Sequence, residues 1–374
     1  MRREAGKEGR GLPRGVFGRR LSGMVDDPDI PAFTGTVTRL TPGPLIAADL
    51  FGPAEIAGLE PDALANINGP SVVRMPDWAA GRRGRYHLYF GHHKGKSIRL
   101  AYADDLAGRW RMHPDPVLHL ADSFFEPEDP PFDPSLPQPH WVAGLKGDYL
   151  YAHIASPDVH VDDDGPDDDG PENDRTRRFV MYFHGLLRNG DQQSRVAFST
   201  DGLHFTAQEP LIGPPYLRGA RLGGWLYLAM WGGRLARARH WTGPFDLAPP
   251  EILPPHLTGG LGRQIRHGHL FAHQGRLHLT GSRIGDAPEA LLHCELIPAE
   301  NWADWRFGPV RELLRPAAGW EGGDTPPTAS EMGTVMGRVN QLRDPALFLD
   351  DGQVYLTYCG GGENGIGMAR VDGL

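Results

Sequence analysis

A short unit of β-strands recurs five times along the chain, and this recurrence limits the fold more than any other feature. The last copy is the clearest: Ala346–Leu349 is a short apolar run, Asp351-Gly352 is a strong hairpin signal, and Val354–Tyr358 is β-branched and aromatic. A third strand follows, Gly365–Val371. The five units begin near residues 69, 156, 216, 266 and 343.

Units of this kind, repeated in a fixed order, predict an all-β five-bladed β-propeller with four-stranded antiparallel blades around a central funnel. The last unit has no fourth strand of its own, and Thr36–Leu40 is expected to complete it. That closure would remove an exposed sheet edge. A β-sandwich with a similar number of strands is the alternative, and the regular order within the units disfavours it. We therefore predict one catalytic propeller domain over residues 33–374.

The remaining composition fits a single domain of this size. Residues 1–32 are basic and glycine-rich at their start and are expected to form a disordered arm, with no secretory signal as written. Two cysteines, Cys294 and Cys359, do not make a disulfide framework, so a reducing, cytoplasmic location is expected. No apolar run reaches the ~20 residues of a membrane helix, so no membrane partner is expected. Oligomeric state stays open.

The net charge of -9 is concentrated in one place. The run 161–175 holds eight acidic residues and one arginine, which accounts for most of that charge. Because the rest of the chain is close to neutral, no nucleic-acid partner is expected. A solvated loop explains the acidic run better than a calcium loop, since its spacing does not match an EF-hand.

The first strand of each propeller blade lies nearest the axis, so the residues that enter those strands should converge at one mouth of the funnel. Aligning the five units brings together polar residues that are far apart in sequence. They are Asn66, Asn68, Gly69–Ser71, Asp158, Tyr216, Arg218, Arg266, His267, Arg343 and Asp344. This set is too polar for packing alone and predicts a pocket for a hydroxylated small ligand, either uncharged or anionic.

Four segments resemble the five-bladed propeller glycosidases, a group that comprises glycoside hydrolase families 43, 32 and 117 and the family 130 phosphorylases. The segments are Asn68–Arg74, Ser156–His160, Ser282–Glu289 and Arg343–Ala346. The resemblance covers about residues 35–374. It is specific for the fold and weak for the activity, because the group holds several reactions.

The resemblance implies carboxylates at the inner strand starts, one as base or nucleophile and one as general acid. Asp158 and Asp344 match these positions, and Glu321 lies in a loop before the last unit that could supply the acid. The first unit departs from family 43, which usually has Asp-Pro where this chain has Gly69-Pro70. The base would then come from elsewhere, or the chemistry would differ.

Further polar residues are expected to bind the carbohydrate substrate. The predicted binding residues are Asn68, His92, His160, Arg218, Arg266, His267, Arg283 and Arg343. His267 could also act as an acid or hold a metal on the axis. Glu363 follows the second strand of the last unit and is expected at the opposite face, and Glu289 is expected in an exposed turn. No cofactor is required, although the resemblance leaves room for a structural calcium ion on the axis.

Three hypotheses about function stay open. The first is a glycoside hydrolase acting on a terminal or short glycan, such as a furanoside, through Asp158, Asp344 and Glu321. The second is a phosphate-dependent phosphorylase, which the arginine-rich mouth and the missing first Asp favour. The third is a sugar-binding propeller without catalysis. For Asp344 beside Arg343, a buried ion pair that joins blades is the competing structural explanation.

Overall fold

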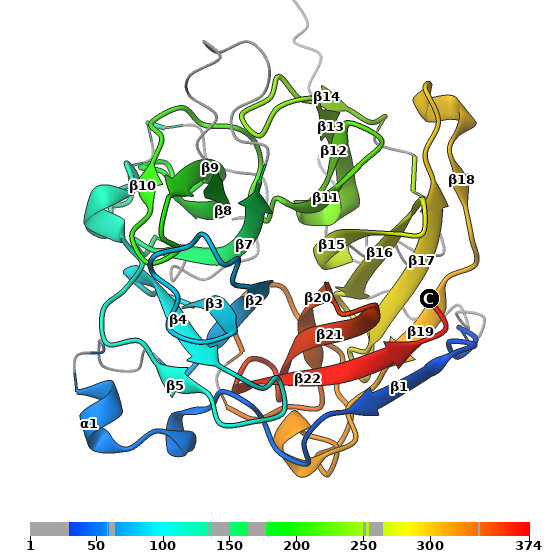
Figure 1. Ribbon diagram of the computed structural model, residues 1–374, viewed down its shortest axis with the longest axis horizontal. Coiled ribbons are helices and arrows are strands. Elements are labelled where there is room, and N and C mark those ends of the chain that lie inside the picture. The colour runs from blue at the N-terminus through cyan, green and yellow to red at the C-terminus, as the bar shows by residue number, and fades with distance from the viewer. Residues whose placement is uncertain are drawn as a thin grey trace, which may run out of the picture. The chain divides into compact units, whose positions relative to one another are not determined.

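Five separate antiparallel sheets surround a common axis, with β2 (Ile67–Arg74), β7 (Ile154–Asp162), β11 (Arg218–Leu222), β15 (Ile265–His273) and β20 (Leu342–Asp350) innermost (Figure 1). This computed structural model describes residues 30–57, 59, 64–133, 135–136, 150–163, 177–249, 252–253, 265–335 and 337–374. The compact unit that contains the sheets runs from Pro31 to Leu374. Residues 1–29 of the predicted arm and most of the acidic run fall outside the described residues and stay predictions, whereas Ala32, at the predicted end of the arm, forms a bridge with Glu312.

The strands follow the chain from the axis outward in four of the five blades. Blade 1 holds β2 (Ile67–Arg74), β3 (Tyr86–His92), β4 (Ser97–Ala103) and β5 (Arg111–Met112), with β6 (Leu118–His119) paired to β4. Blade 2 holds β7 (Ile154–Asp162), β8 (Arg178–Leu186), β9 (Gln192–Ser199) and β10 (Thr206–Ala207). Blade 3 holds β11 (Arg218–Leu222), β12 (Trp225–Met230), β13 (Arg234–Ala238) and β14 (Asp246–Leu247).

Blade 4 holds β15 (Ile265–His273), β16 (Arg276–Arg283), β17 (Leu291–Ile297) and β18 (Arg306–Phe307), with β19 (Arg311–Leu314) paired to β17. Blade 5 holds β20 (Leu342–Asp350), β21 (Gln353–Gly360) and β22 (Gly365–Asp372), and its outer strand is β1 (Thr36–Arg39). β1 pairs with β22 from Thr36 opposite Asp372 to Arg39 opposite Ala369. The predicted five-bladed propeller and its closure by an N-terminal strand are confirmed.

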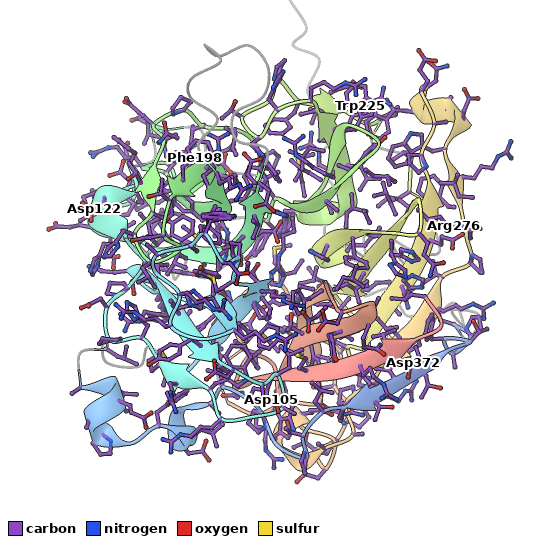
Figure 2. The ribbon with its side chains drawn as sticks, viewed as in Figure 1. Asp105, Asp122, Phe198, Trp225, Arg276 and Asp372 are labelled. Carbon is purple, nitrogen blue, oxygen red and sulfur yellow. The ribbon has the colours of Figure 1, made fainter. Side chains whose placement is uncertain are left out.

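Apolar side chains fill the space between neighbouring sheets. One such cluster joins blades 1 and 2 through Val73, Ile98, Val159 and Phe179, all buried. Charged residues such as Asp105, Arg276 and Asp372 lie at the outer rim instead (Figure 2). Polar residues that are buried near the axis therefore stand out against both the apolar layers and the charged rim.

Helix contributes little to the fold. The described part of the chain contains one short α-helix, α1 (Pro53–Ile56). Among the described residues, no helix has both the length and the apolar character needed to cross a bilayer.

Candidate active site at the propeller axis

One residue at the start of each inner strand has a left-handed backbone conformation. These residues are Gly69, Ser156, Tyr216, His267 and Asp344, with φ between 49° and 63°. In β2, β7, β15 and β20 the strand register shifts at this residue, which marks a β-bulge. Left-handed φ costs a non-glycine residue about 1–2 kcal/mol. Such residues cluster at functional sites, so four strained residues around one axis mark a candidate site.

These five left-handed residues form a continuous chain of contacts around the axis. The Gly69 N–H donates to Asp344 Oδ2 over 3.2 Å, and the Ser156 backbone lies directly against Gly69. The Tyr216 and His267 rings lie 4.1 Å apart between centroids, and His267 Nδ1 contacts Asp344 Oδ1. The inner strand starts therefore converge as predicted.

A second acidic residue, Glu363, joins His267 and Asp344 at the axis. His267, Asp344 and Glu363 each place one ligand-type atom within 4.8 Å of the others, and all three are buried. Glu363 comes from the turn between β21 and β22, where Gly361 and Gly362 have left-handed φ. The expectation that Glu363 lies at the opposite face is wrong, because this glycine turn folds it back onto the axis.

Two buried arginines, Arg266 and Arg343, lie beside the carboxylates of Glu289 and Glu363. Arg266 Nε donates to Glu289 over 2.8 Å, and Arg343 Nε lies 3.5 Å from the other Glu289 oxygen. Arg343 Nη1 also lies 3.6 Å from Glu363 Oε1. Glu289 is completely buried, so its expected place in an exposed turn is wrong. Two carboxylates, Glu289 and Glu363, therefore already match the charge of the two guanidinium groups.

The loop 331–335 passes over the site on the side of Arg266 and Arg343. Arg266 donates to the Glu331 carbonyl, Arg343 to the Gly333 carbonyl over 3.3 Å, and Asn66 to the Val335 carbonyl over 2.9 Å. Blades 4, 5 and 1 thus each contribute one buried donor to a single stretch of backbone. These bonds hold the loop against that side of the axial mouth.

The surroundings of Glu363 favour its ionised form. Burial opposes ionisation, but His93, Arg343 and Arg266 outweigh it and hold the pKa of Glu363 below its ordinary value. His93 Nδ1 lies 2.7 Å from Glu363 Oε2 and also contacts Asn66. His93, adjacent to the predicted His92, is therefore the histidine that reaches the cluster.

Asp158 lies after the bulge of β7, not within it, so its partners differ from those of Asp344. Its Oδ2 accepts the Gly219 N–H over 2.9 Å and lies 2.8 Å from His160 Nε2. Burial opposes its ionisation, but His160 and Arg218 hold its pKa well below its ordinary value. Ser71 and His269 occupy the same place in β2 and β15 and likewise accept an N–H from the next blade. The structure therefore shows Asp158 joining blades 2 and 3.

Asp158 and His160 also line a cavity of about 430 Å³. All five blades contribute to its wall, through the residues that follow each bulge. Arg218 lies at the level of the bulges, where it donates to the Pro70 carbonyl over 2.6 Å and is itself fully buried. This axial cavity and the cluster around Glu363 are thus built from successive segments of the same inner strands.

Glu321 is fully buried and makes contacts away from the cluster. It accepts two hydrogen bonds from Arg39, each of 2.7 Å, and one of 2.7 Å from the Tyr358 hydroxyl. The backbone N–H groups of Ala317 and Ala318 donate to it as well. Five hydrogen bonds saturate this carboxylate, which fastens the closing strand β1 to blade 5.

The other predicted binding residues are buried near the level at which the inner strands start. Asn68 lies in the β2 bulge, and its Nδ2 is 3.4 Å from His93 Nδ1. Arg283 Nε donates to Asp286 over 2.8 Å in the turn after β16. His92 ends β3 opposite Ile67. Of the predicted set, Asn68, Arg266, His267, Arg343 and Asp344 gather around the cluster.

Gly69 explains why the first blade lacks the Asp found in family 43. A Cβ at Gly69 would lie 2.3 Å from the Ser156 Cα, and φ is +58°. We expect Gly69→Ala to lower the free energy of unfolding by at least about 2 kcal/mol, through overpacking added to left-handed strain. Gly352→Ala is the control, because its φ is +81° with open space around it. If urea denaturation shows that the two variants lose the same free energy of unfolding, the packing argument is wrong.

Buried histidines should make the protein acid-sensitive. Burial lowers the pKa of His153 to about 4 and of His269 to about 3. These rings are neutral in the folded state, whereas unfolded histidine takes up a proton below pH 6.5. Stability is therefore complete above pH 6.5 and falls toward pH 4, by about 1.4 kcal/mol per pH unit for each such histidine.

Replacing one of these histidines by a neutral acceptor isolates this effect. His269 Nδ1 accepts the Leu347 N–H over 3.2 Å, and an Asn oxygen can replace that acceptor. In urea denaturation from pH 7 to 4.5, we expect His269→Asn to show a flatter pH dependence than the wild type. Parallel curves would mean that His269 does not contribute to acid sensitivity.

The expected axial calcium ion does not match the donors at the cluster. His267, Asp344 and Glu363 offer one nitrogen and two carboxylates. Calcium takes six to eight oxygen ligands, and a nitrogen-containing set of three suits a borderline divalent ion better. His267 and Asp344 also contact each other directly. The described residues therefore give no support for calcium at this position.

Comparison with solved structures supports the fold. The GH43_1 enzyme from Xanthomonas citri superposes with a TM-score of 0.51 at 14% identity, covering 89% of this chain and 90% of that one. The same enzyme complexed with xylotriose gives 0.51 at 14% identity, covering 87% and 94%. A glycosyl hydrolase from Bacteroides ovatus gives 0.50 at 11% identity, covering 82% and 84%. At these identities the likeness shows a shared five-bladed architecture.

Sequence comparison identifies one relative. No family model matches the chain. Uncharacterized protein R118 of Acanthamoeba polyphaga mimivirus is 31% identical over 326 residues, which cover 82% of this chain and 83% of the viral protein. The chain therefore belongs to the same protein family as mimivirus R118.

Proposed function

We propose that the protein is a glycosidase that cleaves a terminal or short-glycan glycosidic bond at the axial cluster. One observation carries this proposal: His267, Asp344 and Glu363 converge within 4.8 Å at the buried start of the inner strands. Glycosidic cleavage needs a proton donor for the leaving oxygen and a carboxylate on the sugar side. The cluster supplies both kinds of group.

The environments of the two carboxylates suggest their roles. Glu363 lies beside His93 and Arg343, which favour its ionised form, so we assign it as base or nucleophile. Asp344 contacts His267 directly, and burial holds the pKa of this histidine well below its ordinary value, so we assign Asp344 in its protonated form as the proton donor and His267 as the neutral ring that positions it. Asp158 and Glu321 have their oxygens bonded to neighbouring blades or to β1, so we assign them structural roles.

The arginines favour hydrolysis over phosphorolysis. A phosphate-binding site needs cationic side chains whose charge is not already matched. Arg266 contacts Glu289, and Arg343 contacts Glu289, Glu363 and the Gln341 side chain. Water is therefore the expected acceptor, and the phosphorylase remains the second candidate.

A panel of aryl pyranosides and furanosides, assayed with and without phosphate, tests the proposal. Aryl xylosides and arabinofuranosides come first, because solved structures with this fold were complexed with xylose and xylotriose. Release of the aryl group without phosphate is the expected result. Release only with phosphate would establish the phosphorylase, and sugar binding without any release would establish a binding propeller.

Metal removal should have little effect. We propose that the chemistry uses the cluster side chains without calcium, as the poor match of their donors suggests. Treatment with EDTA should change kcat/KM by less than about twofold, because acid–base catalysis by side chains requires no metal. Loss of activity that calcium restores would contradict this expectation.

A further inference from the structure

Two of the left-handed residues, Ser156 and Tyr216, have hydroxyl groups that bond to no described residue. Ser156 is 2% exposed, and its Oγ makes no hydrogen bond to any described residue. Tyr216 is 8% exposed, and no hydrogen bond of its hydroxyl is found within the described ranges. Buried polar groups are normally satisfied, so the Ser156 hydroxyl needs an explanation, and the Tyr216 hydroxyl has its bonding capacity free for a ligand.

Two other buried hydroxyls, those of Ser71 in blade 1 and Tyr182 in blade 2, show how a structural hydroxyl is bonded in this protein. Ser71 Oγ accepts the Val159 N–H over 2.9 Å, and the Tyr182 hydroxyl donates to the Trp241 carbonyl over 2.6 Å. Both join neighbouring blades. Ser156 and Tyr216 make no such bond, so joining blades does not explain their hydroxyls.

The backbone conformation at Ser156 and Tyr216 is a second indication of a ligand site. Ser156 and Tyr216 have φ of 50° and 63°, and a bulky residue in this region is a genuine outlier. Strain of this kind persists where the surrounding structure holds it, and it concentrates at ligand sites. His184 and His267 fix the Tyr216 ring at centroid distances of 4.4 and 4.1 Å. The phenol is therefore held rigidly in place.

We propose that Ser156 and Tyr216 form the hydroxyl-binding part of the site, which holds a neutral sugar unit beside Asp344 and Glu363. This inference rests on the proposed glycosidase function. Serine and tyrosine hydroxyls both donate and accept hydrogen bonds, as sugar hydroxyls require. Burial raises the pKa of Tyr216, so the phenol stays uncharged. The matched arginine charge makes a neutral sugar a better ligand than a uronate or a sugar phosphate.

Equilibrium binding of free aldoses to the full-length protein tests the proposal. D-xylose, L-arabinose, D-glucose and D-galactose are titrated separately and followed by ligand-observed NMR. Ser156→Ala and Tyr216→Phe should each raise the Kd of the aldose that binds by about 5–10-fold, the usual effect of one lost hydrogen bond. Their unfolding midpoints should not fall, because no described partner loses a bond.

Ser71→Ala and Tyr182→Phe are the matched controls. They remove the same atoms from satisfied hydroxyls, so they should lower the unfolding midpoint and leave the Kd unchanged. An unchanged Kd in Ser156→Ala and Tyr216→Phe, or no binding of the four aldoses to the wild type, would overturn the inference. Aldose binding by Ser156 and Tyr216 without glycoside cleavage would overturn only the proposed function.

Discussion

Replacing Asp344 by Asn should lower kcat/KM by a factor of about 10²–10⁴ while the protein stays folded. Asn has the same shape as Asp, and its side-chain oxygen can still accept the Gly69 N–H. The change removes the carboxylate that contacts His267, and with it the proposed proton donor. Glu363→Gln should have an effect of similar size, because it removes the proposed base. The rates are measured on the best aryl glycoside, alongside the unfolding midpoint.

Asp158→Asn is the matched control for this result. Asp158 is as deeply buried as Asp344 and also accepts a backbone N–H, but its partners are Gly219 and His160. We expect this variant to lose about 2 kcal/mol of stability, because a hydrogen bond to a charged group weakens. Its kcat/KM per folded molecule should stay close to that of the wild type. A folded but inactive Asp158→Asn beside an active Asp344→Asn would place the chemistry elsewhere.

Replacing Arg39 by Ala should lower the free energy of unfolding by about 3–5 kcal/mol. Arg39 donates twice to Glu321, which is fully buried, so the substitution leaves a buried carboxylate without its counter-charge. β1 is the strand that closes the propeller by pairing with β22, so the substitution weakens the contact that closes the ring of blades. Urea denaturation of wild type and variant measures the difference.

The neighbouring strand β22 provides a control for Arg39→Ala. Arg370 Nε lies 3.1 Å from Asp372, and both side chains are nearly half exposed. An exposed pair contributes about 0–1 kcal/mol, so Arg370→Ala should change stability little. If Glu321→Gln is added to Arg39→Ala, part of the lost stability should return, since the buried charge is gone. Similar losses in Arg39→Ala and Arg370→Ala would contradict the role given to Glu321.

The architecture could be predicted because it depends on local patterns. The Asp351-Gly352 turn between β20 and β21 has counterparts at Gly223-Gly224 and Gln274-Gly275, and the order of apolar strand segments identifies the two blades whose first strands are joined by longer connections. Closure by β1 follows from the missing outer strand of blade 5. The convergence of the inner strand starts then follows from the propeller geometry. None of these steps requires knowledge of a side-chain position.

The site was harder to predict because a shift of two residues along an inner strand decides which part of the axis a side chain reaches. Asp344 precedes Pro345, as Ser156 precedes Pro157, and both have left-handed φ. Asp158 follows its proline, so it corresponds to Ala346 and lies past the bulge. Alignment on the prolines separates Asp344 from Asp158. Alignment on the hairpins places both in one general region.

Glu363 could not be placed from the sequence. Its approach to Asp344 depends on the left-handed glycines of the β21–β22 turn, and a run of three glycines is compatible with many turns. Glu321 gives the opposite case. Its partner Arg39 lies 282 residues away in sequence, so nothing local reveals that its oxygens are saturated.

The position of a bound sugar tests the central claim most directly. A crystal of Asp344→Asn, soaked with the aryl glycoside that the wild type cleaves best, would show which segment of the inner strands holds the ligand. We predict sugar density beside Glu363, His267 and the left-handed residues Ser156 and Tyr216. Density in the cavity lined by Asp158 and His160, with none at Glu363, would contradict the assignment of the active site to the axial cluster.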